Sequence, residues 1–148
     1  MKRIIVSLAI VLTGIMFIAS TQLLAQKKQP ATAVLQTAAD LKWQVLSPSV
    51  PGVMSVKLWG DSVTGAYGGL TKFPAGFKAP LHHHTYTTNI VVIKGAYTYN
   101  GRTYGPGSFV SVPGGLEHES GGMADSESVF FIEQPGTFDL VPATPPKQ

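Results

Sequence analysis

The chain has 148 residues, enough for one small domain with a single hydrophobic core. It contains no cysteine, which excludes disulfides, thiolate catalysis and thiolate metal ligands. Eleven basic and eight acidic residues give a formal net charge of +3, and two of the basic residues, Lys2 and Arg3, lie at the N-terminus. Without these two the balance is nine against eight, or +1. No basic stripe remains, so we expect no nucleic-acid partner.

The first 25 residues are typical of a secretory signal peptide. Lys2 and Arg3 precede an apolar run over residues 4–18, and a more polar segment ends at Ala25. We predict cleavage after Ala25, a periplasmic or secreted mature protein, and no membrane contact once the leader is removed. Leu23 is larger than the small residue preferred before a cleavage site, so the cleaved bond stays open. An uncleaved N-terminal anchor is the alternative.

Three further segments follow the leader. Residues 26–40 are polar and rich in Ala and Thr, which predicts a flexible lead-in. Residues 41–141 carry the pattern of one β domain. Residues 142–148, with the sequence PATPPKQ, are expected to form a disordered tail.

Short apolar runs alternate with turn residues throughout the β domain. The expected strands cover residues 42–46, 53–59, 66–73, 89–94, 96–99, 108–112, 128–133 and 137–141. Asn100-Gly101 between two of them predicts a type I′ hairpin turn. The run over residues 90–93 is continuously apolar, which predicts a strand covered on both faces. Many short strands without a helical period predict an all-β antiparallel sandwich or barrel.

Three of the four histidines, His82, His83 and His84, are consecutive, and the fourth is His118. Alternate side chains of a strand share a face, so His82 and His84 should point to one side and His83 to the other. An imidazole from a later strand would complete a three-nitrogen face. We therefore predict that His82, His84 and His118 bind one divalent metal ion, which could be iron, manganese, nickel, copper or zinc.

Glycines and prolines frame both histidine stretches at characteristic spacings. The first stretch contains Gly76, His82, His84 and Gly95. The second contains Gly107, Pro113, Gly115 and His118. Together these residues resemble the two motifs of the cupin superfamily. More narrowly, the sequence is similar to single-domain cupins related to the C-terminal domain of anti-sigma factors. The resemblance implies a jelly-roll antiparallel β-barrel with a metal held by the three histidines.

The sequence departs from these motifs at two places. The glutamate of the first motif falls at Thr88 or at Asn89, depending on the end from which it is counted, and neither is a carboxylate. The asparagine of the second motif is replaced by Gly122. A site with three neutral ligands would carry the full charge of its metal, which favours an anionic or enolate-like ligand. Because a ligating imidazole must be neutral, binding should weaken below about pH 6.

Other polar residues are weaker candidates for the cavity. Glu117 and Glu119 flank His118 and should point to the opposite face. Glu133 could replace the missing carboxylate, although an edge position is favoured. Three further residues could line the cavity, and the sequence does not fix their faces: Lys72, Tyr86 and Tyr97.

Two classes of function fit these observations, and no catalytic residue can be named. The first is an exported metal-dependent enzyme, resembling cupin dioxygenases, that acts on a small molecule. The second is a non-catalytic cupin that binds or senses a metal or a small ligand. A third and simpler reading is a barrel that has lost its site and forms a homodimer through its flanking strands.

Overall fold

The computed structural model describes residues 32–143. The predicted leader and tail fall wholly or largely outside this range. Residues 36–143 belong to one compact unit, to which the rest of the description applies. It begins with a short 3₁₀ helix, Ala38–Asp40, whose Asp40 carboxylate accepts hydrogen bonds from the backbone and side chain of Thr37. No helix in the described range is long and apolar enough to cross a membrane.

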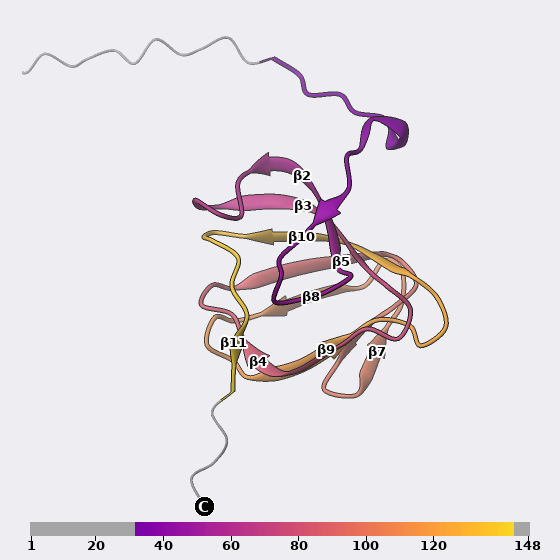
Figure 1. The fold of residues 1–148 in the computed structure, drawn as a ribbon, viewed down its shortest axis with the longest axis vertical. Coiled ribbons are helices and arrows are strands. Elements are labelled where there is room, and N and C mark those ends of the chain that lie inside the picture. Colours follow the sequence, from indigo (N-terminus) through magenta and orange to yellow (C-terminus); the bar gives the residue numbers. More distant parts are fainter. Residues whose placement is uncertain (1–31, 144–148) are drawn as a thin grey trace, which may run out of the picture. The chain divides into compact units, whose positions relative to one another are not determined.

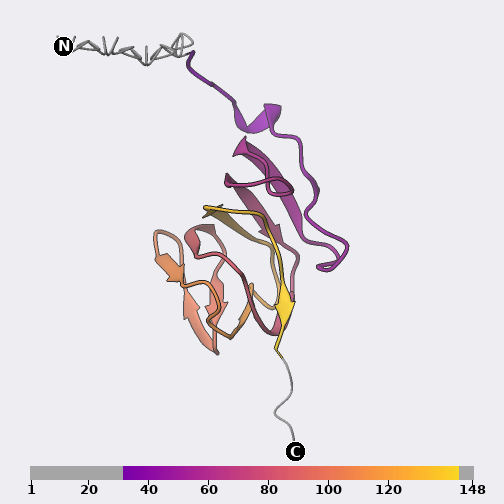
Figure 2. The ribbon, with the colours of Figure 1, turned by 90° about the vertical axis from the view of Figure 1, so that its left-hand side faces the viewer.

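The unit consists of two antiparallel sheets, drawn in Figures 1 and 2. The larger sheet has the strand order β1 (Gln44–Val45), β2 (Met54–Gly60), β3 (Tyr67–Phe73), β10 (Ser128–Gln134), β5 (Thr88–Lys94) and β8 (Phe109–Val112). The smaller sheet has the order β11 (Val141–Pro142), β4 (Lys78–His83), β9 (His118–Gly121), β6 (Tyr97–Tyr99) and β7 (Arg102–Tyr104). All paired strands are antiparallel, which confirms the predicted all-β antiparallel class.

The two sheets are not joined into one closed barrel in the described part of the chain. No strand of one sheet pairs with a strand of the other. The edge strands explain this difference from the expected barrel, because β1 and β11 have two residues each, β7 has three and β8 has four. Such short edges end the hydrogen-bond ladder before it can pass from one sheet to the other.

The hairpin turn predicted at Asn100-Gly101 is present between β6 and β7. Asn100 and Gly101 have φ angles of 46° and 78°, both in the left-handed region that a type I′ turn requires. The predicted strand over residues 137–141 is wrong for most of its length, since only Val141 and Pro142 form strand β11. Phe138 and Leu140 instead pack toward the interior of the unit.

Aromatic rings fill much of the space between the sheets. The ring of Phe73 lies 4.4 Å from that of Phe77 and 4.9 Å from that of Phe130, measured between centroids. Tyr97, from the smaller sheet, packs edge-on against Phe130 at 5.4 Å. Aromatic pairs at these distances add to the stabilisation from apolar burial, so this cluster fixes one sheet against the other.

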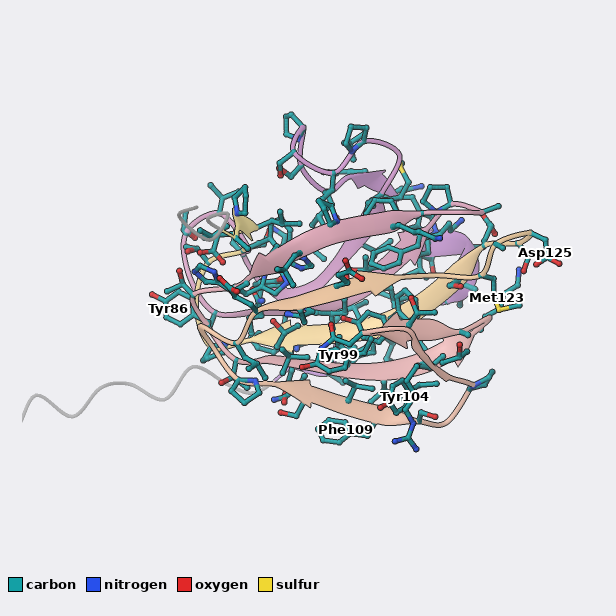
Figure 3. All side chains as sticks on the ribbon, turned by 90° about the horizontal axis from the view of Figure 1, so that it is seen from below. Tyr86, Tyr99, Tyr104, Phe109, Met123 and Asp125 are labelled. Atoms are coloured by element: carbon teal, nitrogen blue, oxygen red, sulfur yellow. The ribbon has the colours of Figure 1, made fainter. Side chains whose placement is uncertain are left out.

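The outer face of the larger sheet exposes apolar side chains, although the sequence predicted that the strand over residues 90–93 would be covered on both faces. On β5, Ile90 and Val92 are buried, whereas Val91 and Ile93 are 37% and 50% exposed, so the strand is covered on one face only. A row of directly paired residues crosses this outer face: Leu70, Phe131, Val91 and Phe109. Phe109, at the sheet edge, is 64% exposed and projects from the surface in Figure 3.

Candidate metal centre

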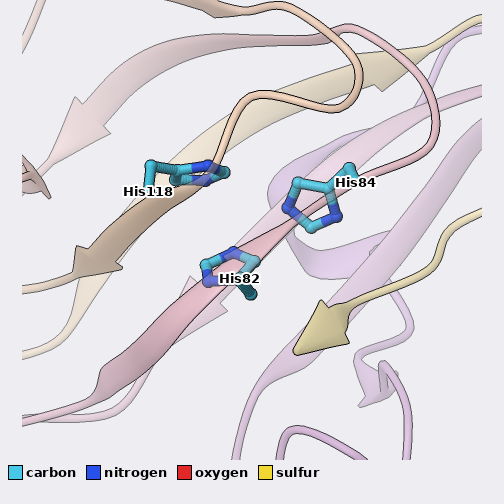
Figure 4. A group of neighbouring side chains, drawn as sticks. All are labelled: His82, His84 and His118. Atoms are coloured by element: carbon cyan, nitrogen blue, oxygen red, sulfur yellow. The ribbon is translucent and has the colours of Figure 1, made fainter. Parts of the chain in front are cut away.

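The three histidines selected from the sequence converge between the two sheets (Figure 4). One ring nitrogen from each of His82, His84 and His118 lies within 4.8 Å of the other two. The ring centroids are 4.3 Å apart for His82 and His118, and 5.0 Å apart for His82 and His84. The predicted convergence of imidazoles from two separate strands is therefore confirmed.

A β-bulge on β4 sets the inward direction of its histidines. His82 is paired with His118, and Ala79 is paired with Ser120, so three steps on β4 match two steps on β9. The extra residue leaves Pro80 and Leu81 both exposed, while Ala79 and His82 are both buried. Proline is tolerated at a bulge because it has no N–H to contribute to the ladder.

The C-terminal segment holds His84, which follows β4 directly. The Nδ1 atom of His84 donates a hydrogen bond to the backbone oxygen of Asp139. The carboxylate of Asp139 accepts hydrogen bonds from the backbone nitrogen of Thr85 at 2.9 Å and from the Thr85 hydroxyl. These hydrogen bonds hold the segment that follows β10 next to the three histidines. In Figure 1 this segment runs from the larger sheet to β4, where it pairs as β11.

Hydrogen bonds determine the tautomer of all three rings. The Nδ1 atom of His82 contacts the backbone oxygen of Pro80 at 2.6 Å, and that of His118 contacts the backbone oxygen of Leu116 at 2.9 Å. A carbonyl oxygen can only accept a hydrogen bond, so each Nδ1, including that of His84, carries the proton. The lone pair of each neutral ring is therefore on Nε2, as a metal ligand requires.

Burial keeps these imidazoles neutral. Desolvation lowers the pKa of His82 to about 4, with smaller contributions from the neighbouring histidines, and the hydrogen bond to Pro80 acts in the opposite direction. Desolvation also lowers the pKa values of His84 and His118, again against the effect of their carbonyl partners. At neutral pH all three rings are available as ligands without first losing a proton.

A cavity of about 50 Å³ adjoins the three rings. None of its lining residues is an aspartate, glutamate, lysine or arginine. Its polar lining besides the histidines consists of Tyr67, Thr71, Thr88, Tyr97, Ser120 and Gln134. The rest is apolar and includes Phe138 and Leu140 of the C-terminal segment. Any charge in this cavity must therefore come from a bound ion or ligand.

The structure separates the two positions at which the motif glutamate could fall. Thr88 is 4% exposed and lines the cavity. Asn89 lies on the other face of β5, where it contacts Glu133 and the Ser111 hydroxyl. Glu133 therefore does not replace the missing carboxylate.

The remaining candidates are also separated. Of the three residues that the sequence suggested as possible cavity lining, Tyr97 lines the cavity, and Lys72 and Tyr86 do not. Lys72 instead pairs with Glu127 and lies over the ring of Trp43. Glu119 is exposed on the opposite side of β9 from His118, as predicted.

Three residues near the histidines were not found from the sequence. Asp139 holds His84, Gln134 contacts Thr88 on the opposite wall, and the ring of Tyr99 stacks on that of His118 at 5.4 Å. Asp139 and Gln134 lie far along the chain from the histidine stretches, and neither belongs to a recognisable motif. For Tyr99 the only indication was its position two residues after Tyr97 on the same strand, which places both side chains on one face.

The donor set fits a divalent cation. One ring nitrogen of each histidine lies within 4.8 Å of those of the other two, close enough for the three rings to turn toward a single ion at the usual distance of about 2.0–2.1 Å. The carbonyl partners on Nδ1 fix ring orientation in the manner typical of histidine metal ligands. Thiolate sites are excluded because the chain has no cysteine.

Solved structures with the same architecture define the class of protein. An RmlC-like cupin protein from Ralstonia eutropha JMP134 is 26% identical, with a TM-score of 0.60 over 71% of this chain and 69% of that chain. The polyketide cyclase RemF from Streptomyces resistomycificus is 19% identical, with a TM-score of 0.62 over 76% and 87%. A chain from the complex of SigE with the anti-sigma ChrR from Rhodobacter sphaeroides is 22% identical, with a TM-score of 0.54 over 67% and 52%. The protein is thus a cupin.

The family can be stated more narrowly. Residues 32–145 match the model of a family described as "Domain of unknown function (DUF4437)", and the chain belongs to that family. No curated protein matches the sequence.

Proposed function

We propose that this cupin binds one divalent metal ion through the Nε2 atoms of His82, His84 and His118, and that the adjoining cavity holds a small-molecule ligand of that metal. The observation that carries the proposal is the set of three Nδ1–carbonyl hydrogen bonds, which leave three converging lone pairs. Imidazoles kept merely as polar lining have no need of a common tautomer. A bound cation would act as a Lewis acid on an oxygen ligand and orient it.

The residues of the chain have three tasks in this proposal. Backbone oxygens of residues 80, 116 and 139 orient the ligating rings. The apolar lining, which includes Phe138 and Leu140, excludes bulk water from the bound molecule. The polar residues on the opposite wall can hydrogen-bond its oxygen atoms.

Two uses of such a site are open to experiment. A metal-dependent small-molecule oxygenase is the first candidate, supported by a ligand set that occupies only three positions of the cation and leaves others free for substrate and oxygen. A non-catalytic binding or sensing protein is the second. It is favoured by the absence of a carboxylate in the cavity lining, because no residue there is suited to act as a general base.

Export of the mature protein remains part of the proposal. Its support is the sequence alone, in which two basic residues, an apolar run and Ala25 follow in the order of a signal peptide. Expression of the full-length chain in a Gram-negative host, followed by mass spectrometry of the periplasmic fraction, would reveal the cleaved N-terminus. Retention of the intact chain in the membrane fraction would favour the uncleaved anchor.

A homodimer is a further proposal, supported by the apolar row on the outer face of the larger sheet. Phe109 and Val91, which lie next to each other in this row, are 64% and 37% exposed. None of the four paired residues is charged, so a two-fold contact between two such rows would bring no like charges together.

The metal proposal can be tested by elemental analysis of the purified mature protein. Mass spectrometry should find about one divalent ion per chain, and the ion should be lost in His82→Ala and His118→Ala. His83→Ala is the matched control and should retain it. Oxygen consumption with a panel of β-diketones, thiols and phenols would then distinguish an oxygenase from a binding protein. A metal-free wild-type protein after exposure to each cation between pH 6 and 8 would refute the proposal.

A further inference from the structure

A row of polar side chains faces the cavity on the wall opposite His82 and His118. Tyr67 on β3, Gln134 on β10 and Thr88 on β5 come from three neighbouring strands of the larger sheet. Tyr67 and Gln134 are direct cross-strand partners. The three residues are 8%, 2% and 4% exposed, so their hydrogen bonds are shielded from solvent.

In this row each residue donates a hydrogen bond to the next, from Tyr67 through Gln134 to Thr88. The Tyr67 hydroxyl donates to Oε1 of Gln134 at 3.1 Å, which places the amide nitrogen of Gln134 toward Thr88. Nε2 of Gln134 then donates to Oγ1 of Thr88. Burial, together with the charge of Asp139, raises the pKa of Tyr67, so its hydroxyl remains a donor throughout the neutral range.

The order of these bonds leaves one proton without a partner in the row. Oγ1 of Thr88 already accepts from Gln134, so its own O–H is free to donate. Thr88 lines the cavity, and a buried donor gains most when it meets an acceptor there. No hydrogen bond donated by this hydroxyl occurs in the described part of the chain, where Oγ1 of Thr88 only accepts.

We infer, as an extension of the proposed metal function, that the hydroxyl of Thr88 donates a hydrogen bond to an oxygen of a small carboxylate or enolate anion bound in this cavity. Charge balance supports an anion. Three neutral imidazoles leave the full charge of a divalent cation uncompensated, and no acidic side chain lines the cavity. A neutral ligand of equal size would accept the same hydrogen bond but would not offset that charge.

The cavity also limits the size of the ligand. At roughly 10–15 Å³ for each water-sized group, a volume of about 50 Å³ accommodates on the order of four such groups. Acetate, with its four non-hydrogen atoms, is therefore a suitable probe. Acetamide has the same shape without the charge and serves as the matched neutral ligand.

The inference is tested on the mature protein loaded with Co²⁺, whose visible absorption reports binding at the metal. Cobalt affinity is measured first by calorimetry for the wild type, Thr88→Val and Thr88→Ser, and it should be the same in all three. Each loaded protein is then titrated with acetate and with acetamide. The wild type should bind acetate at least tenfold more tightly than acetamide.

The two substitutions separate the hydroxyl from the rest of the side chain. Thr88→Val should weaken acetate binding about tenfold or more, as expected for the loss of a hydrogen bond to a charged group. Thr88→Ser keeps the hydroxyl and should remain within about threefold of the wild type. Equal acetate affinity in Thr88→Val and the wild type would overturn the inference while leaving the metal site intact. A wild type that binds no cobalt would overturn both proposals.

Discussion

His82 and His118 lie directly opposite each other on the neighbouring antiparallel strands β4 and β9, with ring centroids 4.3 Å apart. Each side chain is 1% exposed. Two imidazoles held this close in a buried position cannot both be protonated without strong repulsion. Their common tautomer is set by the carbonyl oxygens of Pro80 and Leu116, and it leaves both Nε2 atoms available for the proposed cation.

The lowered histidine pKa values predict how the stability of the metal-free protein depends on pH. His82 titrates at an ordinary value of 6.5 in the unfolded chain and at about 4 in the folded one. Between these values the unfolded state binds the proton and the folded state does not, so the free energy of unfolding should fall as the pH drops from 6.5 to 4. The contribution of His82 is on the order of 3 kcal/mol.

Urea denaturation of the chelator-treated protein at several pH values between 7 and 4.5 would measure this effect. His82→Gln is the matched variant, and its stability should fall less steeply over the same range. Equal slopes for the variant and the wild type would contradict the prediction. The same low pKa values imply that metal loss begins at a lower pH than the value of about 6 expected for ordinary histidines.

Asp139 is predicted to act on metal affinity through His84. Its carboxylate binds the backbone and hydroxyl of Thr85, and its backbone oxygen holds Nδ1 of His84. Asp139→Ala should loosen this segment and weaken zinc binding by about tenfold or more, since groups that orient a ligating histidine commonly have effects of this size. Isothermal titration with zinc would measure it.

The control for this prediction is Asp125→Ala, the same change at an exposed position in the loop before β10. It should leave zinc affinity unchanged. If both variants bound zinc as the wild type does, the role assigned to Asp139 would be wrong.

Gln134 is predicted to contribute to stability as well as to ligand recognition. Gln134→Leu keeps the volume but leaves the hydroxyls of Tyr67 and Thr88 without their partner in a buried place. The free energy of unfolding should fall by about 1–3 kcal/mol. Thermal or urea denaturation would test this against Gln44→Leu, which alters an exposed residue on β1 and should have little effect. An unchanged stability in Gln134→Leu would argue against the buried hydrogen-bonded row.

The exposed apolar row predicts the behaviour of the protein in solution. Phe109→Glu places a charge at the most exposed residue of that row and should convert a homodimer into a monomer, as measured by light scattering with size-exclusion chromatography. Val63→Glu changes a residue that is 80% exposed in the turn after β2 and should leave the dimer intact. A wild type that is monomeric at all concentrations would refute the dimer.

Short-range rules recovered much of the fold and the centre of the site. The alternation of side chains along a strand separated His82 and His84 from His83, and the Asn100-Gly101 turn fixed the hairpin. Apolar runs located most strands of the larger sheet. They failed to locate β4 and β9, because β4 contains lysine, proline and histidines instead of an apolar pattern, and β9 has four residues. The histidine spacing and the motif resemblance indicated strands there instead.

Features that depend on long-range contact could not be obtained in this way. The bulge at Pro80 and Leu81 depends on the register between β4 and β9. Asp139 and Gln134 reach His84 and Thr88 from 55 and 46 residues away. The separation into two sheets follows from edge strands of two to four residues, and the ends of such short strands are the least predictable part of a pattern.

The most direct measurement is a crystal structure of the mature protein soaked with zinc or cobalt, with anomalous diffraction recorded at the metal edge. The account predicts a single strong anomalous peak about 2.0–2.1 Å from Nε2 of each of His82, His84 and His118. A cation bound elsewhere, bound through Nδ1, or absent despite full exposure to the metal would contradict it.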